Sequence, residues 1–127
     1  MIRILIILAL VIPSLCIGRS VAKYKYYRNG NIMYEYFKQK NQTVRLTQYY
    51  KSGAVKSISH FKNGHKHGLW QEFTEEGLQT TNAFFNKNKK DGFWTFYNPE
   101  GDTHCSLYYK GNKIFKVIQA PPVVAVR

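Results

Sequence analysis

Cysteine and acidic residues are scarce in this chain, and both shortages exclude classes of protein. The 127 residues include two cysteines, Cys16 and Cys105, and seven acidic residues against 19 lysines and arginines. If Cys16 leaves with an N-terminal leader, Cys105 has no partner within the chain, so no internal disulfide holds the fold. We expect Cys105 to lie on a strand as a small apolar residue.

The usual catalytic patterns are also missing. The chain has no Gly-rich phosphate loop, no G-x-S-x-G elbow and no Cys-x-x-Cys pair. Three of the seven carboxylates fall in predicted turns, which leaves few for acid–base chemistry. His65 and His67 lie near His60, but no third ligand is placed by spacing. We therefore predict no enzymatic activity, no metal site and no cofactor.

The N-terminal residues 1–22 are predicted to be a secretory signal peptide. Arg3 precedes an apolar run that ends at Pro13 and Ser14, and small residues follow. The run is shorter than the roughly 20 residues that span a membrane. Cleavage is expected after Gly18 or Ala22; a lipid anchor on Cys16 and an uncleaved anchor are the alternatives. The protein is thus predicted to be exported, and to be periplasmic, secreted or associated with the cell envelope.

The remaining chain is basic. Residues 23–127 contain 17 basic and 7 acidic residues, and 17 − 7 gives a net charge of +10. Such a positive charge favours the binding of acidic partners. Lysines in turns also prevent exposed sheet edges from pairing with other chains, and this role needs no partner. Nucleic acid is permitted by the basic, aromatic composition, but export argues against it. We predict an acidic protein partner, with association at the envelope or a membrane surface included, and a monomeric chain.

A 24-residue unit is written almost twice between Phe61 and Gly101. The offset pairs four positions of the first copy with four of the second, namely Gly68, Trp70, Phe73 and Gly77 with Gly92, Trp94, Tyr97 and Gly101. A fixed period of this size is typical of repeat architectures. The offset extends in both directions into degraded copies, and about four units fit in residues 23–116. Residues 117–127 are predicted to be a tail or a cap.

Each unit is predicted to be a β-hairpin. Turn-forming clusters recur at alternating spacings of 11 and 13 residues, and Asn63-Gly64 is the strongest of them because both residue types tolerate the positive φ of a type I′ turn. Strands of roughly 7 to 9 residues remain between the turns. Past residue 22 no window has the apolar spacing of a helix. The predicted fold is all-β, an antiparallel meander of about four 24-residue hairpin repeats.

The repeated Gly, Trp and aromatic positions resemble those of MORN repeats. The segments Asn63–Gly77 and Asn88–Gly101 carry this pattern, and they are most similar to the variant repeat of bacterial antitoxin-like proteins of the YwqK type. The resemblance covers about residues 27–115. It implies a meander of hairpins and a non-catalytic role in binding or scaffolding. The first unit departs from it, because Val44-Arg45-Leu46 stands where Gly-x-Trp is expected.

Aromatic side chains make up 16% of the sequence and offer both structural and contact roles. We expect Trp70 and Trp94 to be core pillars one repeat apart, since each aromatic ring contributes about 150 to 250 Å² of contact area. For the tyrosines, burial and partner contact remain equally open. The candidate partner-binding residues are Lys87, Lys89, Lys90, Tyr49, Tyr50, Tyr108 and Tyr109. Two functions follow as hypotheses, an exported binding or scaffold module and, alternatively, an antitoxin or immunity component that neutralises a cognate toxin by direct binding.

Overall fold

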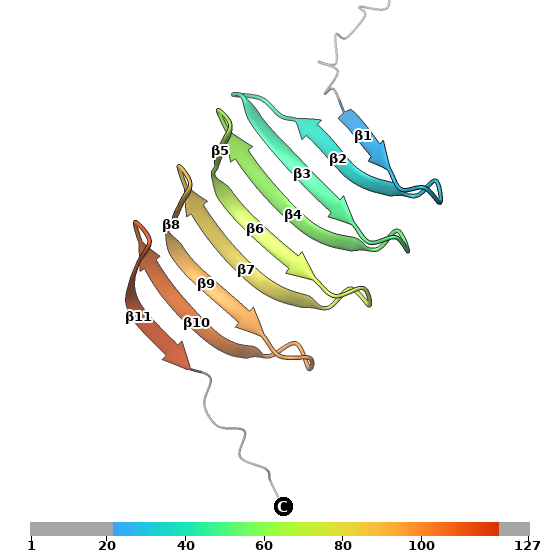
Figure 1. Cartoon of the computed structure of the whole chain (residues 1–127). Coiled ribbons are helices and arrows are strands. Elements are labelled where there is room, and N and C mark those ends of the chain that lie inside the picture. The colour runs from blue at the N-terminus through green and yellow to red at the C-terminus, as the bar shows by residue number, and fades with distance from the viewer. Residues whose placement is uncertain (1–21, 120–127) are drawn as a thin grey trace, which may run out of the picture.

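The computed structural model describes residues 22–119, which form one antiparallel β-sheet without a helix (Figure 1). This confirms the predicted all-β meander. The strands are β1 (Ala22–Tyr26), β2 (Ile32–Lys38), β3 (Thr43–Tyr49), β4 (Val55–Lys62), β5 (His65–Lys66), β6 (Gly68–Phe73), β7 (Gln79–Asn86), β8 (Lys89–Lys90), β9 (Gly92–Tyr97), β10 (Thr103–Lys110) and β11 (Lys113–Gln119). Over this range no helix is long and apolar enough to cross a membrane.

Two predicted segments fall mainly beyond the described residues. The predicted signal peptide, with Cys16, lies outside them except for Ala22, which begins β1 and pairs with Phe37. The predicted boundary between the repeat domain and the tail, after residue 116, falls inside β11. Residues 120–127 of that tail also lie outside.

Strand order follows chain order, so that the sheet is open and its first and last strands are the two edges (Figure 1). The short strand β5 pairs with β4, and one residue separates it from β6. In the same way, β8 pairs with β7, and one residue separates it from β9. The strands predicted after the turns at residues 63–64 and 87–88 are therefore each divided into two. The interruption falls at His67 and Asp91, directly before Gly68 and Gly92, whose φ angles of +89° and +71° lie in the left-handed region that glycine adopts without strain.

Two kinds of turn join the strands. Four turns share one pattern, in which a glycine with φ between 88° and 93° donates to the carbonyl three residues earlier; these glycines are Gly30, Gly53, Gly77 and Gly101. Other connections are two-residue turns with both φ angles positive, as type I′ requires. Asn63-Gly64 is such a turn, with φ of 50° and 77°, as predicted, and Lys87-Asn88 and Gly111-Asn112 have the same form.

The sheet is a single layer, and this limits how far any side chain is buried. None of the described side chains is completely buried, and the least exposed apolar residues are Ala83, Phe85 and Tyr109. Ala83 pairs with Trp70 across β6 and β7, and the register of β7 with β9 places it beside Trp94 as well. A small residue between two large rings explains why Ala83 is 3% exposed.

Candidate binding surface

Five aromatic rings form a continuous ladder across the middle of the sheet. Successive ring centroids are 5.7, 4.9, 5.1 and 5.4 Å apart along Phe61, Trp70, Phe85, Trp94 and Tyr109. The contacts are tilted or edge-to-face, the arrangements that aromatic pairs prefer. The two tryptophans are half-buried, because one of their sides faces solvent. This aromatic ladder takes the place of a core sandwiched between two layers.

Each tryptophan of the ladder is also fixed by a hydrogen bond and a cation. Trp70 Nε1 donates to the His60 carbonyl at 3.2 Å, and Trp94 Nε1 donates to the Phe84 carbonyl at 3.0 Å. The ammonium of Lys66 lies 4.5 Å from the Trp70 ring centroid, and that of Lys90 lies 4.4 Å from the Trp94 ring centroid. These are cation–π distances. Lys90, a predicted partner-binding residue, is thus half-buried over the ladder.

Antiparallel connectivity sorts the turns into two rows at opposite ends of the strands (Figure 1). We call one of them the basic turn row, because the strand ends and turns on that side carry many lysines. Its lysines are Lys38, Lys40, Lys62, Lys66, Lys87, Lys89, Lys90, Lys110 and Lys113. All of them are exposed except Lys66 and Lys90. Asp91 is the acidic residue at this end.

The opposite row of turns has the reverse balance. Its turns contain Arg28 and Lys51, but also Glu75, Glu76 and Glu100. Hydrogen bonds from its own backbone and from Thr74 hold the pKa of Glu76 below its ordinary value, so this carboxylate stays charged at neutral pH. The sheet is therefore electrically polar along its strands, with positive charge at one end. An acidic surface is attracted to the basic turn row and repelled by the glutamates of the other row.

Asn88 and Asn112 connect neighbouring turns of the basic row. The backbone N–H of Asn88 donates to the Lys66 carbonyl at 2.9 Å, and its side-chain oxygen accepts from the Lys66 N–H at 2.7 Å. Asn112 makes the same two bonds with Lys90, at 2.9 and 2.8 Å. We call each pair of bonds an asparagine clasp. The clasp at Asn88 holds the turn that carries Lys87 and Lys89, both exposed.

The four predicted tyrosines do not form one patch. Tyr49 and Tyr50 lie at the end of β3, whereas Tyr108 and Tyr109 lie on β10, with four long strands between. The Tyr50 hydroxyl donates to the Phe73 carbonyl at 2.8 Å. Tyr108 packs against the Phe93 ring, at 5.0 Å between centroids, and Tyr109 is 8% exposed within the ladder.

Tyr49 is likewise engaged inside the protein. Its hydroxyl donates to Glu35 Oε2 at 3.0 Å. Burial raises the pKa of Tyr49, and the hydrogen bond to the Glu35 carboxylate and the negative charge of that carboxylate raise it further. Tyr49 thus stays neutral and serves the packing of β2 against β3.

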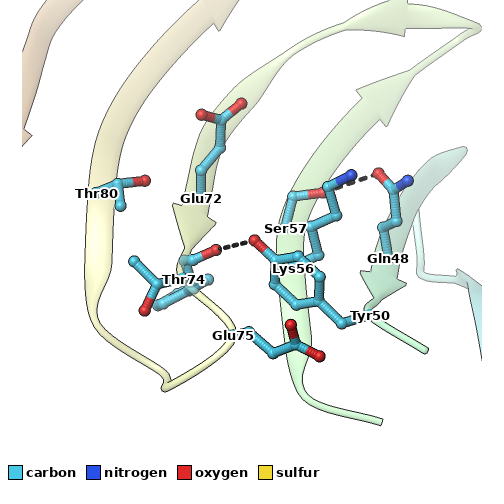
Figure 2. Close-up of a pocket in the computed structure, with 9 residues that line it drawn as sticks. Gln48, Tyr50, Lys56, Ser57, Glu72, Thr74, Glu75 and Thr80 are labelled. Carbon is cyan, nitrogen blue, oxygen red and sulfur yellow. Dashed lines mark hydrogen bonds between the residues drawn. The ribbon is translucent and has the colours of Figure 1, made fainter. Parts of the chain in front are cut away.

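A shallow pocket of about 470 Å³ lies near the glutamate-bearing turns (Figure 2). Figure 2 shows the Tyr50–Phe73 hydrogen bond on one side of it and Ser57 directed at Gln48 on the other. The lining residues are Gln48, Tyr50, Lys56, Ser57, Glu72, Phe73, Thr74, Glu75 and Thr80. No histidine or cysteine is among them, so the lining offers no imidazole or thiol for nucleophilic chemistry. A hollow of about 210 Å³ lies between Trp70 and Trp94.

The histidines considered as metal ligands make internal hydrogen bonds. His60 Nδ1 donates to the Leu69 carbonyl at 2.8 Å, and the Asn88 amide lies 2.8 Å from His65 Nδ1. Within residues 22–119 no group of three or more His, Cys, Asp or Glu side chains could hold a metal ion.

Sequence reasoning missed several exposed residues. Lys38, Lys40 and Lys62 were not assigned to a binding surface, although they lie at the same end as Lys87 and Lys89. Counting every second turn of a meander would have grouped them. The exposed apolar side chains of β11 were missed as well, because no local pattern marks a strand as an edge.

No protein-family model matches this sequence, and a comparison with curated proteins finds no significant match to it.

Proposed function

We propose that this protein is a non-enzymatic binding module whose basic turn row binds an acidic surface of a protein partner. The observation that supports this most is the gathering of lysines from six strands and the turns between them at one end of the sheet, with glutamates at the other. Ammonium groups gathered at one end of the sheet repel one another, and an acidic surface relieves this repulsion.

The proposal includes the place and type of the module. The apolar N-terminal segment with Arg3 supports export, so the partner would be met at the cell envelope. The paired Gly-x-Trp positions at Gly68 and Gly92 support a MORN-like repeat, in which a rigid hairpin sheet presents turns to a partner. The exposed Lys87 and Lys89 would make first contact, while Lys90 acts mainly through the ladder.

Charge reversal at each end of the sheet tests the proposal. The probe is fluorescein-labelled polyglutamate of about 20 residues, chosen to cover the length of one row of turns. The double variant Lys87→Glu and Lys89→Glu should slow association about tenfold at low salt, because steering acts between exposed charges. The matched control is Arg28→Glu with Lys51→Glu, which changes the net charge equally at the other end and should leave the rate within about twofold.

Salt provides the second measurement. Raising ionic strength from about 0.1 M to about 1 M shortens the Debye length from about 10 Å to about 3 Å, so the association rate should fall far more than the dissociation rate rises. Equal effects of the two double variants would mean that net charge alone attracts the probe, and the proposal would fail. Tighter binding of single-stranded DNA of equal charge would point to nucleic acid instead.

A further inference from the structure

The last strand, β11, is an open edge with unusual side chains. Within residues 22–119 it pairs with β10 alone, and every residue from Lys113 to Gln119 is exposed. Four large apolar residues project from it, with 54%, 65%, 57% and 39% of their surface exposed for Ile114, Phe115, Val117 and Ile118. The other edge differs, because lysine alternates with tyrosine in β1. Among the described strands, β11 thus carries the largest group of exposed aliphatic and phenylalanine side chains.

An edge of this kind is a template for another strand. Backbone N–H and C=O groups on the outer side of β11 have no neighbouring strand among the described residues, and natural sheets usually protect such edges with charges, proline or bulges. A register shift lies between Tyr108 and Tyr109, but the residues from Lys116 to Gln119 pair regularly with β10. This part of the edge presents a regular ladder to an incoming segment.

The positive charge of the β11 edge determines which kind of segment can pair with it. Lys113 and Lys116 lie on β11 and Lys110 lies at the end of β10, while no acidic residue occurs between Thr103 and Gln119. A second copy of this chain would bring either the same lysines or Lys23 and Lys25 of β1 against them. Like charges on facing strands are unfavourable, whereas carboxylates opposite lysines are favourable. The edge is also continuous with the basic turn row at Lys110 and Lys113.

We infer that β11 accepts an extended segment of an acidic partner protein as an additional strand of the sheet. Residue 116 shares a face with Tyr108 and residue 117 with Leu107, so the two faces of β11 differ at this point. A segment of alternating glutamate and valine would place carboxylates on the face of Lys116 and methyl groups on the face of Val117. Main-chain hydrogen bonds would supply affinity and the side chains would supply selectivity. The inference rests on the proposed function, since it names where part of the acidic partner docks.

A peptide pair tests strand addition directly. The probe is an acetylated, amidated (Glu-Val)4 peptide, and its control has the same sequence with N-methyl groups on every residue, which remove the backbone donors along both edges of the peptide without changing its charge. With the full chain, the unmodified peptide should bind at least tenfold more tightly. Hydrogen exchange followed by NMR should slow about tenfold or more at those β11 amides that do not bond to β10, and not at β1.

Matched variants locate the site. Lys116→Glu should weaken binding of the peptide about tenfold, whereas Lys23→Glu on the other edge should leave it unchanged. Equal binding of both peptides, with sensitivity to Lys87→Glu and Lys89→Glu, would overturn strand addition while the basic turn row stands as the binding surface. Binding of neither the peptides nor polyglutamate would overturn the proposed function as well. Dimers in sedimentation that Val117→Lys abolishes would identify a second copy as the occupant and overturn the inference.

Discussion

At the scale of single residues, stability depends on side chains that have one side in solvent. Trp94 contacts Phe85 and Tyr109 in the ladder and donates to the Phe84 carbonyl, with Lys90 above its ring. In a single-layer sheet these contacts replace the second layer that would otherwise cover the ring. Each interior residue of the ladder, Trp70, Phe85 or Trp94, therefore supports two neighbours, and removing one leaves a gap that no opposite layer can fill.

Trp94→Ala should lower the free energy of unfolding by about 3 kcal/mol, the lower end for removing a large aromatic ring, because the ring is half-buried. Urea unfolding followed by circular dichroism measures this. The matched control is Phe93→Ala on the same strand, whose side chain is 55% exposed on the other face and should cost about 1 kcal/mol. Equal losses in the two variants would contradict the structural role of the ladder.

The raised pKa of Tyr49 predicts that the stability of the protein depends on pH in the alkaline range. Its pKa is raised above the ordinary 10.0, so its contribution is fully present below about pH 10 and is lost as pH rises through the folded-state pKa. The free energy of unfolding should therefore fall as pH rises above about 10, and fall less steeply in Tyr49→Phe. The comparison of the two proteins removes the contribution of the other tyrosines. Parallel pH profiles would show that the folded protein does not hold Tyr49 neutral.

At the scale of elements, the hairpins are joined by two devices that recur at the same offset. The ladder joins them through side chains, and the asparagine clasps join neighbouring two-residue turns through Asn88 and Asn112. At the equivalent earlier position the chain has Gly64, and there Asn63 N–H reaches the Gln42 carbonyl at 3.3 Å instead. The clasp thus depends on a residue that both adopts a positive φ and carries an amide.

Asn88→Gly should cost about 1 kcal/mol of unfolding free energy, because it keeps the positive φ and removes the side-chain bonds to Lys66 and His65. Lys87→Gly in the same turn is the control. Lys87 has a φ of 47° and no clasp, so this change should be neutral or slightly stabilising. Thermal unfolding of both variants gives the comparison, and a Lys87→Gly loss as large as that of Asn88→Gly would argue against the clasp.

At the scale of the whole molecule, the open meander gives each strand contacts with its immediate neighbours. Interior strands are paired on both sides, whereas β1 and β11 are paired on one (Figure 1). Stability in such an array is a sum of local units and their interfaces, so the edges should open most easily.

Hydrogen exchange of the free protein should therefore be slowest in β6, β7 and β9, where the ladder and both neighbours protect the backbone, and fastest in β1 and β11. Mass spectrometry of exchanged peptides resolves these regions. Intermediate rates are expected for β3 and β4. Protection of β11 equal to that of β7 would contradict a free edge.

Local residue chemistry was enough to predict much of the fold. Asn63-Gly64 and the glycines of the other turns specify positive φ, and the aromatic segments between them favour strands. The equivalence of Trp70 and Trp94 also followed from the period. The half-burial of these rings did not, because it depends on whether a second layer exists. Nor did the break directly before Gly68 and Gly92, because a glycine at these positions looks the same in sequence as a small residue inside a continuous strand.

The sequence by itself thus determined where the chain turns, that it forms strands, and that it is basic. Turn propensity and positive charge are properties of a residue and its near neighbours, so a linear reading captures them. Tertiary structure decided which lysines gather, since only alternating strand direction brings Lys38, Lys62 and Lys87 to one end. Tertiary structure also decided that Lys90 covers the Trp94 ring while Lys87 remains exposed. It placed the apolar residues of β11 at an edge of the sheet, because position in a sheet depends on strand order and not on local sequence.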